Sequence, residues 1–154
     1  MPEYMPATII VPTFALSLKT IQTALQIEGP FDETVTRNDG TTALSLHQAD
    51  WGEFAVLEIG LVAADIAFDR QSDASDEYDA EVRYFRPDTA TGAGLDIVRK
   101  TLHNHDPIIS LSSLAQLAAS EPLTLDAIRA CLGLPHETVA EWTARHTLSG
   151  EVLA

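Results

Sequence analysis

Residues 34–47 read TVTRNDGTTALSLH, and this stretch predicts a β-hairpin. Two β-rich runs, 34–37 and 41–47, flank the turn residues Asn38, Asp39 and Gly40. Glycine supplies the positive φ that a tight hairpin turn needs. Strands joined by so short a turn pair antiparallel, so the stretch places the fold among those built on an antiparallel sheet.

The residues around the hairpin predict one helix and further strands. Apolar residues recur at three- and four-residue spacing over residues 14–27, and Gly29 and Pro30 end this helix. β-rich runs predict further strands at residues 53–59, 62–69 and 80–86. One helix against one face of four or five antiparallel strands is an α+β layer, and we expect this acidic sheet domain to span residues 1–87.

The second half of the chain changes to a helical period. Residues 88–94 have the Gly- and Thr-rich composition of a hinge loop, and residues 95–154 are expected to form a helical subdomain. Thr124 suits a helix N-cap and Gly133 a C-cap. The expected helices cover residues 95–102, 112–119, 124–132 and 135–146. The fold class that we expect is therefore α+β, with a tri-helical C-terminal part.

Residues 110–152 resemble the helix-turn-helix core of winged-helix regulators, whereas residues 1–105 resemble no family. In that motif large apolar residues flank the turn glycine, as they do in Leu132-Gly133-Leu134, and Ile128, Val139 and Trp142 match other buried positions. The resemblance implies a DNA-reading second helix and binding as a homodimer. That helix, however, carries His136, Glu137, Thr138, Glu141, Arg145 and His146, with two acids against one arginine. Acids facing DNA add repulsion, so a packing or protein-binding role is the favoured interpretation.

The charge of the chain is strongly negative. Its 154 residues, enough for one domain or two small ones, carry 9 Lys and Arg against 23 Asp and Glu, a net charge of −14. Residues 1–90 contribute −11 (16 acids, 5 bases) and residues 91–154 contribute −3 (7 acids, 4 bases). Such a surface repels phosphate backbones and anionic lipid, so we expect neither direct nucleic-acid binding nor membrane binding. Basic partners are attracted instead.

The densest acidic run, residues 69–81, is the candidate partner-binding site. It has six acids and one base, and it joins two predicted strands. One interpretation is a solvated loop that keeps the sheet edge soluble. The other is a docking surface for a basic partner, in which spaced carboxylates imitate a phosphate array. The candidate residues are Asp69, Asp73, Asp76, Glu77, Asp79 and Glu81.

Two further groups of residues are weaker candidates for a metal site and an anion site. His103, His105 and Asp106 with the distant His47 provide the ligand types of a metal site but lack its spacing, and residues 91–96 provide two glycines before a predicted helix. We interpret the first group as a polar helix end and the second as a hinge. The lone Cys131 is expected to be a buried, inert thiol. The aromatic residues, Trp51 among them, are expected to pack in the core.

No nucleophile motif is present, so we expect no enzyme, catalytic residue, cofactor or metal. No segment has the length and hydropathy of a membrane span or signal peptide, and a cytoplasmic protein is expected. The leading hypothesis is a non-catalytic acidic regulator or inhibitor that occupies a basic surface of a nucleic-acid-handling protein. In size, charge and lack of motifs it is similar to anti-CRISPR, nuclease-inhibitor and immunity proteins. The alternatives are a DNA-binding regulator and, lowest, a small enzyme or ligand-binding domain.

Overall fold

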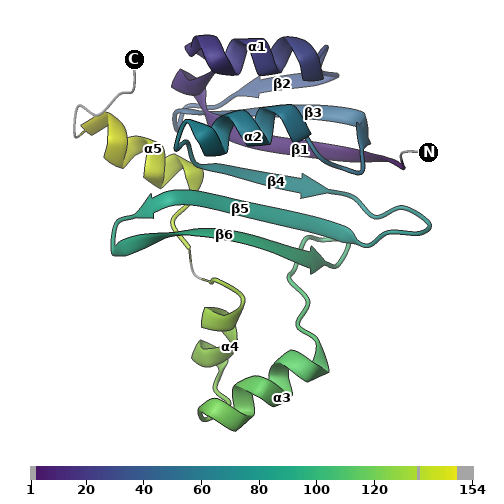
Figure 1. Cartoon of the computed structure of the whole chain (residues 1–154), viewed down its shortest axis with the longest axis vertical. Coiled ribbons are helices and arrows are strands. Elements are labelled where there is room, and N and C mark those ends of the chain that lie inside the picture. The colour runs from purple at the N-terminus through teal and green to yellow at the C-terminus, as the bar shows by residue number, and fades with distance from the viewer. Residues whose placement is uncertain (1–2, 135, 149–154) are drawn as a thin grey trace.

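The computed structural model describes residues 3–134 and 136–148 and shows an antiparallel sheet with helices on it (Figure 1). The α+β fold class is confirmed. The elements follow in the order β1 (Tyr4–Pro12), the 3-10 helix η1 (Thr13–Ser17), α1 (Lys19–Glu28), β2 (Glu33–Thr36), β3 (Thr41–Asp50), α2 (Ala55–Ala63), β4 (Phe68–Ser72), β5 (Ala80–Thr89), β6 (Gly92–Thr101), α3 (Leu111–Ser120), α4 (Leu125–Cys131) and α5 (Val139–Leu148).

The six strands have the spatial order β2-β3-β1-β4-β5-β6, and every neighbouring pair is antiparallel. The first four strands and the two helices between them follow the β-α-β-β-α-β order of the ferredoxin-like split βαβ motif. In this arrangement β3 and β4 both run opposite to β1, so their carboxyl ends meet at one end of the sheet. The turn after β3 and the loop after β4 therefore lie close together, and they carry the site described below.

Helices α1 and α2 lie side by side over one face of the sheet (Figure 1). Every second residue of β1 faces this layer, and Ile9 and Val11 are fully buried there. On the helices, Ile21 of α1 and Leu57 and Leu61 of α2 are fully buried against them. The predicted helix of the first half is confirmed as η1 followed by α1, and the predicted hairpin is confirmed as β2 and β3.

The prediction of a strand over residues 53–59 is wrong, because residues 55–63 form the helix α2, and of the strand predicted over residues 62–69 only residues 68 and 69 lie in a strand, β4. Its Val and Ile residues favour strands as single residues, but the segment buries Leu57, Glu58 and Leu61, which lie on one face at helical spacing. Gly60 is not a bulge. It lies where α2 approaches α1, and a β-carbon there would meet Ile21 at 3.5 Å and Ala24 at 3.9 Å.

The predicted helix over residues 95–102 is also wrong, since these residues belong to β6 and its end. The register pairs β5 with β6 from Ala80↔Thr101 to Thr89↔Gly92, so the expected hinge over residues 88–94 is the turn of a long hairpin. Gly94 is required there, because a β-carbon would lie 2.4 Å from the carbonyl oxygens of Arg86 and Pro87. The backbone hydrogen-bonding groups of β5 require a partner strand, and this requirement overrides the helical spacing of Leu95, Val98 and Leu102.

The last three helices are present, but they do not pack as one tri-helical unit. Helix α4 packs against α3, whereas α5 contacts β1 and β3. The cap predictions are confirmed: Thr124 accepts a hydrogen bond from the Ala127 amide, and Gly133 has a φ of 76° at the end of α4. The segment after Gly133 returns to the sheet, where Trp142 is 1% exposed. Residues 149–152 of the winged-helix resemblance lie outside the described residues, and the proposed division into two domains stays a prediction.

Candidate functional site

The structure divides the six predicted partner-binding acids into two groups. Asp69 and Glu81 form ion pairs with buried arginines, Asp69 Oδ1 with Arg86 at 2.8 Å and Glu81 Oε1 with Arg70 at 2.8 Å. Burial raises the pKa of Asp69, and the Arg86 guanidinium opposes this shift. The two carboxylates neutralise cations of the sheet itself, so neither offers a free charge to a partner.

The other four acids lie on the exposed loop between β4 and β5. Asp79 pairs with Lys100 at 3.1 Å where both side chains are exposed, and Asp73 lies 3.6 Å from His105. Asp76 and Glu77 are exposed to solvent. The Ser75 hydroxyl shapes the loop by accepting hydrogen bonds from the amides of Glu77 and Tyr78. Exposed ion pairs contribute little stability, so these four acids remain available to an external cation.

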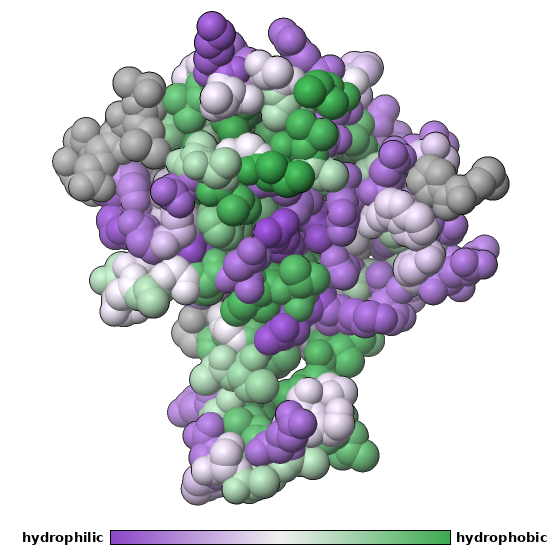
Figure 2. Space-filling model, viewed as in Figure 1, coloured by the Kyte–Doolittle hydropathy of each residue, from purple (hydrophilic) through white to green (hydrophobic). Residues whose placement is uncertain are grey.

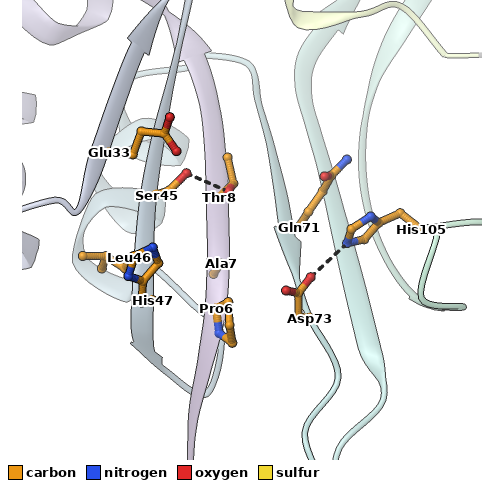
Figure 3. A pocket seen from close by; sticks show the side chains of 10 residues that line it. All are labelled: Pro6, Ala7, Thr8, Glu33, Ser45, Leu46, His47, Gln71, Asp73 and His105. Carbon is orange, nitrogen blue, oxygen red and sulfur yellow. Dashed lines mark hydrogen bonds and ion pairs between the residues drawn. The ribbon is translucent and has the colours of Figure 1, made fainter.

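A polar groove lies on one side of this loop (Figure 3). Its volume is about 220 Å³. The hydroxyls of Thr8 and Ser45 are 2.8 Å apart in it, and His47 lies across the groove from the Asp73–His105 pair. The structure thus brings two of the proposed metal ligands, His47 and His105, to one groove. Within residues 3–134 and 136–148, however, no group of three His, Cys, Asp or Glu side chains is arranged to hold a metal ion.

A second hollow, of about 310 Å³, lies on the other side of the loop. Its aromatic wall is Trp51, from the turn after β3, and Tyr78, from the β4–β5 loop. The two rings meet edge to face with centroids 5.4 Å apart, and the residues are 46% and 43% exposed. The remaining lining residues are Met5, Glu53, Ser72, Asp79, Glu81 and Lys100. The expectation that Trp51 packs in the core is therefore wrong.

The backbone at Trp51 is held in an uncommon conformation. Trp51 has a φ of 57°, in the left-handed region that bulky residues rarely adopt, and Gly52 follows with a φ of 67°. Gly52 is required, because a β-carbon there would lie 2.5 Å from that of Ser72. The Trp51 amide donates to the Glu3 carbonyl oxygen at 2.7 Å, which fixes the turn. Such strain persists where the surrounding structure imposes it, and it is concentrated at functional sites.

Glu53 is the carboxylate of this hollow that no hydrogen bond or ion pair neutralises within the described part of the chain. Partial burial raises its pKa, Arg70 lowers it, and the nearby Glu58 and Glu81 raise it further. By contrast, Glu81 is paired with Arg70 and Asp79 with Lys100. An aromatic wall beside an unneutralised carboxylate has the chemistry to hold an ammonium or guanidinium group, because the ring faces and the carboxylate both attract cations.

The residues of the winged-helix resemblance serve contacts within the chain. Arg145 pairs with Glu137 at 2.9 Å and with Asp88 at 2.8 Å, and the Trp142 indole donates to Asp88 at 2.8 Å. The His136 ring packs against Tyr84 with centroids 4.1 Å apart and the planes tilted by 35°. The arginine that a DNA-reading helix would direct at phosphate is thus held against β5.

Two minor candidates also differ from expectation. Cys131 is exposed rather than buried. Residues 91–96 lie at the β5–β6 turn and in β6, so the two glycines do not precede a helix and form no anion site of that kind.

Sequence reasoning located the acidic loop but missed Trp51, Glu53 and Tyr78. Trp51 and Tyr78 lie 27 positions apart in the sequence. They meet only because β3 and β4 end at the same edge of the sheet, which depends on recognising α2 as a helix. The local signal was the Trp-Gly pair between the predicted strands 41–47 and 53–59, since glycine there indicates a sharp turn that presents its neighbour.

Comparison with protein-family models, curated proteins and solved structures gives no match for this chain. Among residues 3–134 and 136–148, no helix has the length and apolar character to span a membrane.

Proposed function

We propose that the protein is a non-catalytic binding protein that captures a basic segment of a partner protein. A lysine or arginine side chain of the partner enters the hollow between Trp51 and Tyr78 and pairs with Glu53. The observation that carries the proposal is the exposed aromatic pair beside a carboxylate that has no partner among the described residues.

Several physical effects support this assignment. Trp and Tyr are the residues that most often dominate binding energy at protein interfaces. A cation over their rings gains about 0.5–2 kcal/mol, and the Glu53 carboxylate adds a charge-assisted hydrogen bond. The exposed acids of the adjoining loop, Asp76 and Glu77, attract a basic surface from a distance and raise the association rate. The proposal keeps the regulatory or inhibitory role expected from the sequence, with a nucleic-acid-handling protein as the partner class.

The experiment uses a short peptide of alternating lysine and glycine as the probe, with affinity measured by calorimetry at low salt. Trp51→Ala and Glu53→Gln are each expected to weaken binding about tenfold, the loss of roughly 1.4 kcal/mol. Glu33→Gln is the matched control, because it removes an equal charge from the groove on the other side of the loop. It is expected to leave the affinity within about twofold, since Glu33 does not line the hollow and the attraction between exposed charges in water falls with distance.

Charge-reversal variants separate the long-range attraction that raises the association rate from the binding of the peptide in the hollow. Glu77→Lys is expected to slow association while Glu33→Lys does not, and the affinity of the unaltered protein is expected to fall steeply as salt rises. Equal losses in Glu53→Gln and Glu33→Gln would show that only net charge attracts the peptide. That result, or binding that salt does not change, overturns the proposal.

A further inference from the structure

The two helices that project from the sheet expose apolar side chains and bury none. We define the arm as residues 108–132, which contain α3 and α4, and Figure 1 shows it extending beyond β6. Neither helix contains a buried residue. Leu111 is 82% exposed, Leu125 61% and Leu123 51%. Helices this short are marginal in water without packing of an apolar face, and α3 and α4 pack on each other while leaving these leucines exposed. A surface that covers the leucines would stabilise the arm further.

The charge of the arm distinguishes it from the rest of the molecule. Residues 107–120 carry no charged side chain, and Glu121, Asp126 and Arg129 give the arm a net charge of −1 out of −14. Green and pale residues accordingly make up most of its surface in Figure 2. A strongly basic partner finds little to attract it here. Two copies of the chain, which repel each other through their acidic sheets, meet least opposition at their arms.

The arm also carries both halves of a self-complementary contact. A hollow of about 350 Å³ lies between the arm and β6. It is partly apolar, and its lining residues are Val98, Ile108, Ile109, Cys131 and Leu132 together with Arg99, Lys100, Ser110 and Ser113. Leu111, the most exposed large apolar side chain described, directly follows the lining residue Ser110 in the chain. A protruding side chain close to a partly apolar hollow on one surface suits a two-fold contact, in which each copy supplies both features to the other.

We propose that two copies of the chain associate through their arms into a symmetric dimer, with Leu111 of each copy in the hollow of the other. The arm has 25 residues, and a stable protein interface uses about 20–30 residues a side. Two helical hairpins packed in this way form a four-helix arrangement, which is a stable solution for helices apolar on one side.

The experiment is sedimentation equilibrium of the full chain over a range of concentrations. The expected mass is twice the 16.7 kDa of one chain, and Leu111→Asp is expected to return it to 16.7 kDa. Ile59→Asp is the matched control, because Ile59 is 70% exposed on α2, away from the arm. It is expected to remain dimeric. Circular dichroism checks that both variants keep the fold, as their exposure predicts.

The exposed Cys131 provides a second measurement. Its thiol lines the hollow, so reaction with a thiol reagent is expected to slow as the protein concentration rises, and to be fast at all concentrations in Leu111→Asp.

The salt dependence of the dimer separates this proposal from the proposed function. Salt screens the repulsion between two acidic copies and strengthens the dimer, whereas it weakens capture of a basic peptide.

Three results overturn the dimer. The first is a mass of 16.7 kDa at every concentration, and the second is a dimer that Leu111→Asp leaves intact. The third is a monomer whose arm binds neutral lipid vesicles, which assigns the arm to a membrane surface. None of these results affects the test with the lysine peptide, which reports on Trp51 and Glu53.

Discussion

At the scale of single residues, Trp51 combines features that stability alone does not explain. A left-handed backbone costs a bulky residue about 1–3 kcal/mol, and nearly half of the side chain faces solvent instead of the core. Its sequence neighbour Phe54 is fully buried, so the fold places one aromatic residue of this turn inside and the other outside. The proposed binding of a ligand by the exposed indole gives this strain a functional reason.

This interpretation predicts the effect of Trp51→Gly. Glycine relieves the backbone strain but loses the Tyr78 contact, worth about 0.5–1.5 kcal/mol, so the free energy of unfolding should change by less than about 1 kcal/mol. Binding of the lysine peptide should nevertheless weaken about tenfold, as in Trp51→Ala. Urea unfolding and calorimetry measure the two effects. Leu57→Ala is the control for a core residue, with a loss of about 2–5 kcal/mol, and an equal loss in Trp51→Gly would place Trp51 among the structural residues.

The raised pKa of Glu53 predicts how binding depends on pH. A cation binds the carboxylate and not the neutral acid, so affinity is greatest above this pKa and falls as Glu53 becomes protonated. The loss should begin at a higher pH than the ordinary glutamate value of about 4.3 implies. Calorimetric titrations of the lysine peptide between about pH 8 and pH 4 measure it. Glu53→Gln should lack this early loss, and superimposable profiles of the two proteins would contradict the role of Glu53.

At the scale of elements, Glu58 joins a helix to two strands. Its carboxylate, 3% exposed on α2, accepts from the Phe54 amide at 3.0 Å, pairs with Arg70 of β4 at 3.1 Å and pairs with Arg83 of β5 at 2.8 Å. Arg70 is itself 2% exposed. These contacts fix the rotation of α2, and with it the turn that carries Trp51 and Glu53.

Glu58→Ala is therefore expected to lower the free energy of unfolding by about 3–5 kcal/mol, because it takes one of two anions from the buried Arg70 and from the half-buried Arg83 and leaves the Phe54 amide without its acceptor. Urea unfolding measures the loss. Glu53→Ala removes an exposed acid just before α2 and should lower the free energy of unfolding by less than about 0.5 kcal/mol. Similar small losses in both variants would show that Glu81 and Asp96 suffice to neutralise the two arginines.

The elements also show which parts of the fold the sequence could reveal. The hairpin at Gly40 and the caps at Thr124 and Gly133 were predictable, because each depends on a few adjacent residues. Helix α2 and strand β6 were not, because tertiary contacts decide them. A run rich in Val and Ile forms a helix in which Glu58 reaches two arginines, and Leu95 and Val98 become strand residues because β6 pairs with the edge of β5. The acidic loop could be predicted from composition. The aromatic pair beside it could not, because Trp51 and Tyr78 meet only through the spatial order of the strands.

At the scale of the whole molecule, charge and apolar surface are separated. Asp69, Glu81 and Glu58 neutralise arginines within the sheet, while four exposed acids lie on the β4–β5 loop and residues 108–120 of the arm carry no charge. The proposed capture of basic segments uses the acidic sheet and the proposed dimer uses the weakly charged arm, so the two proposals do not compete for one surface. If both hold, two copies joined through their arms present two hollows to one partner.

The pair of hollows predicts avidity. A probe with two lysine peptides on a flexible Gly-Ser linker should bind the dimer about 10²–10⁴-fold more tightly than a single peptide, once the linker is long enough to reach both hollows. Below that length the gain should vanish, and above it the gain should decline slowly as the effective concentration falls. Calorimetry across a series of linker lengths measures the dependence. Leu111→Asp keeps each hollow but removes the second copy, so it should bind single and double probes with equal affinity per peptide. Ile59→Asp, which keeps the arm, should retain the gain, and a gain that persists in Leu111→Asp would place both binding sites on one chain.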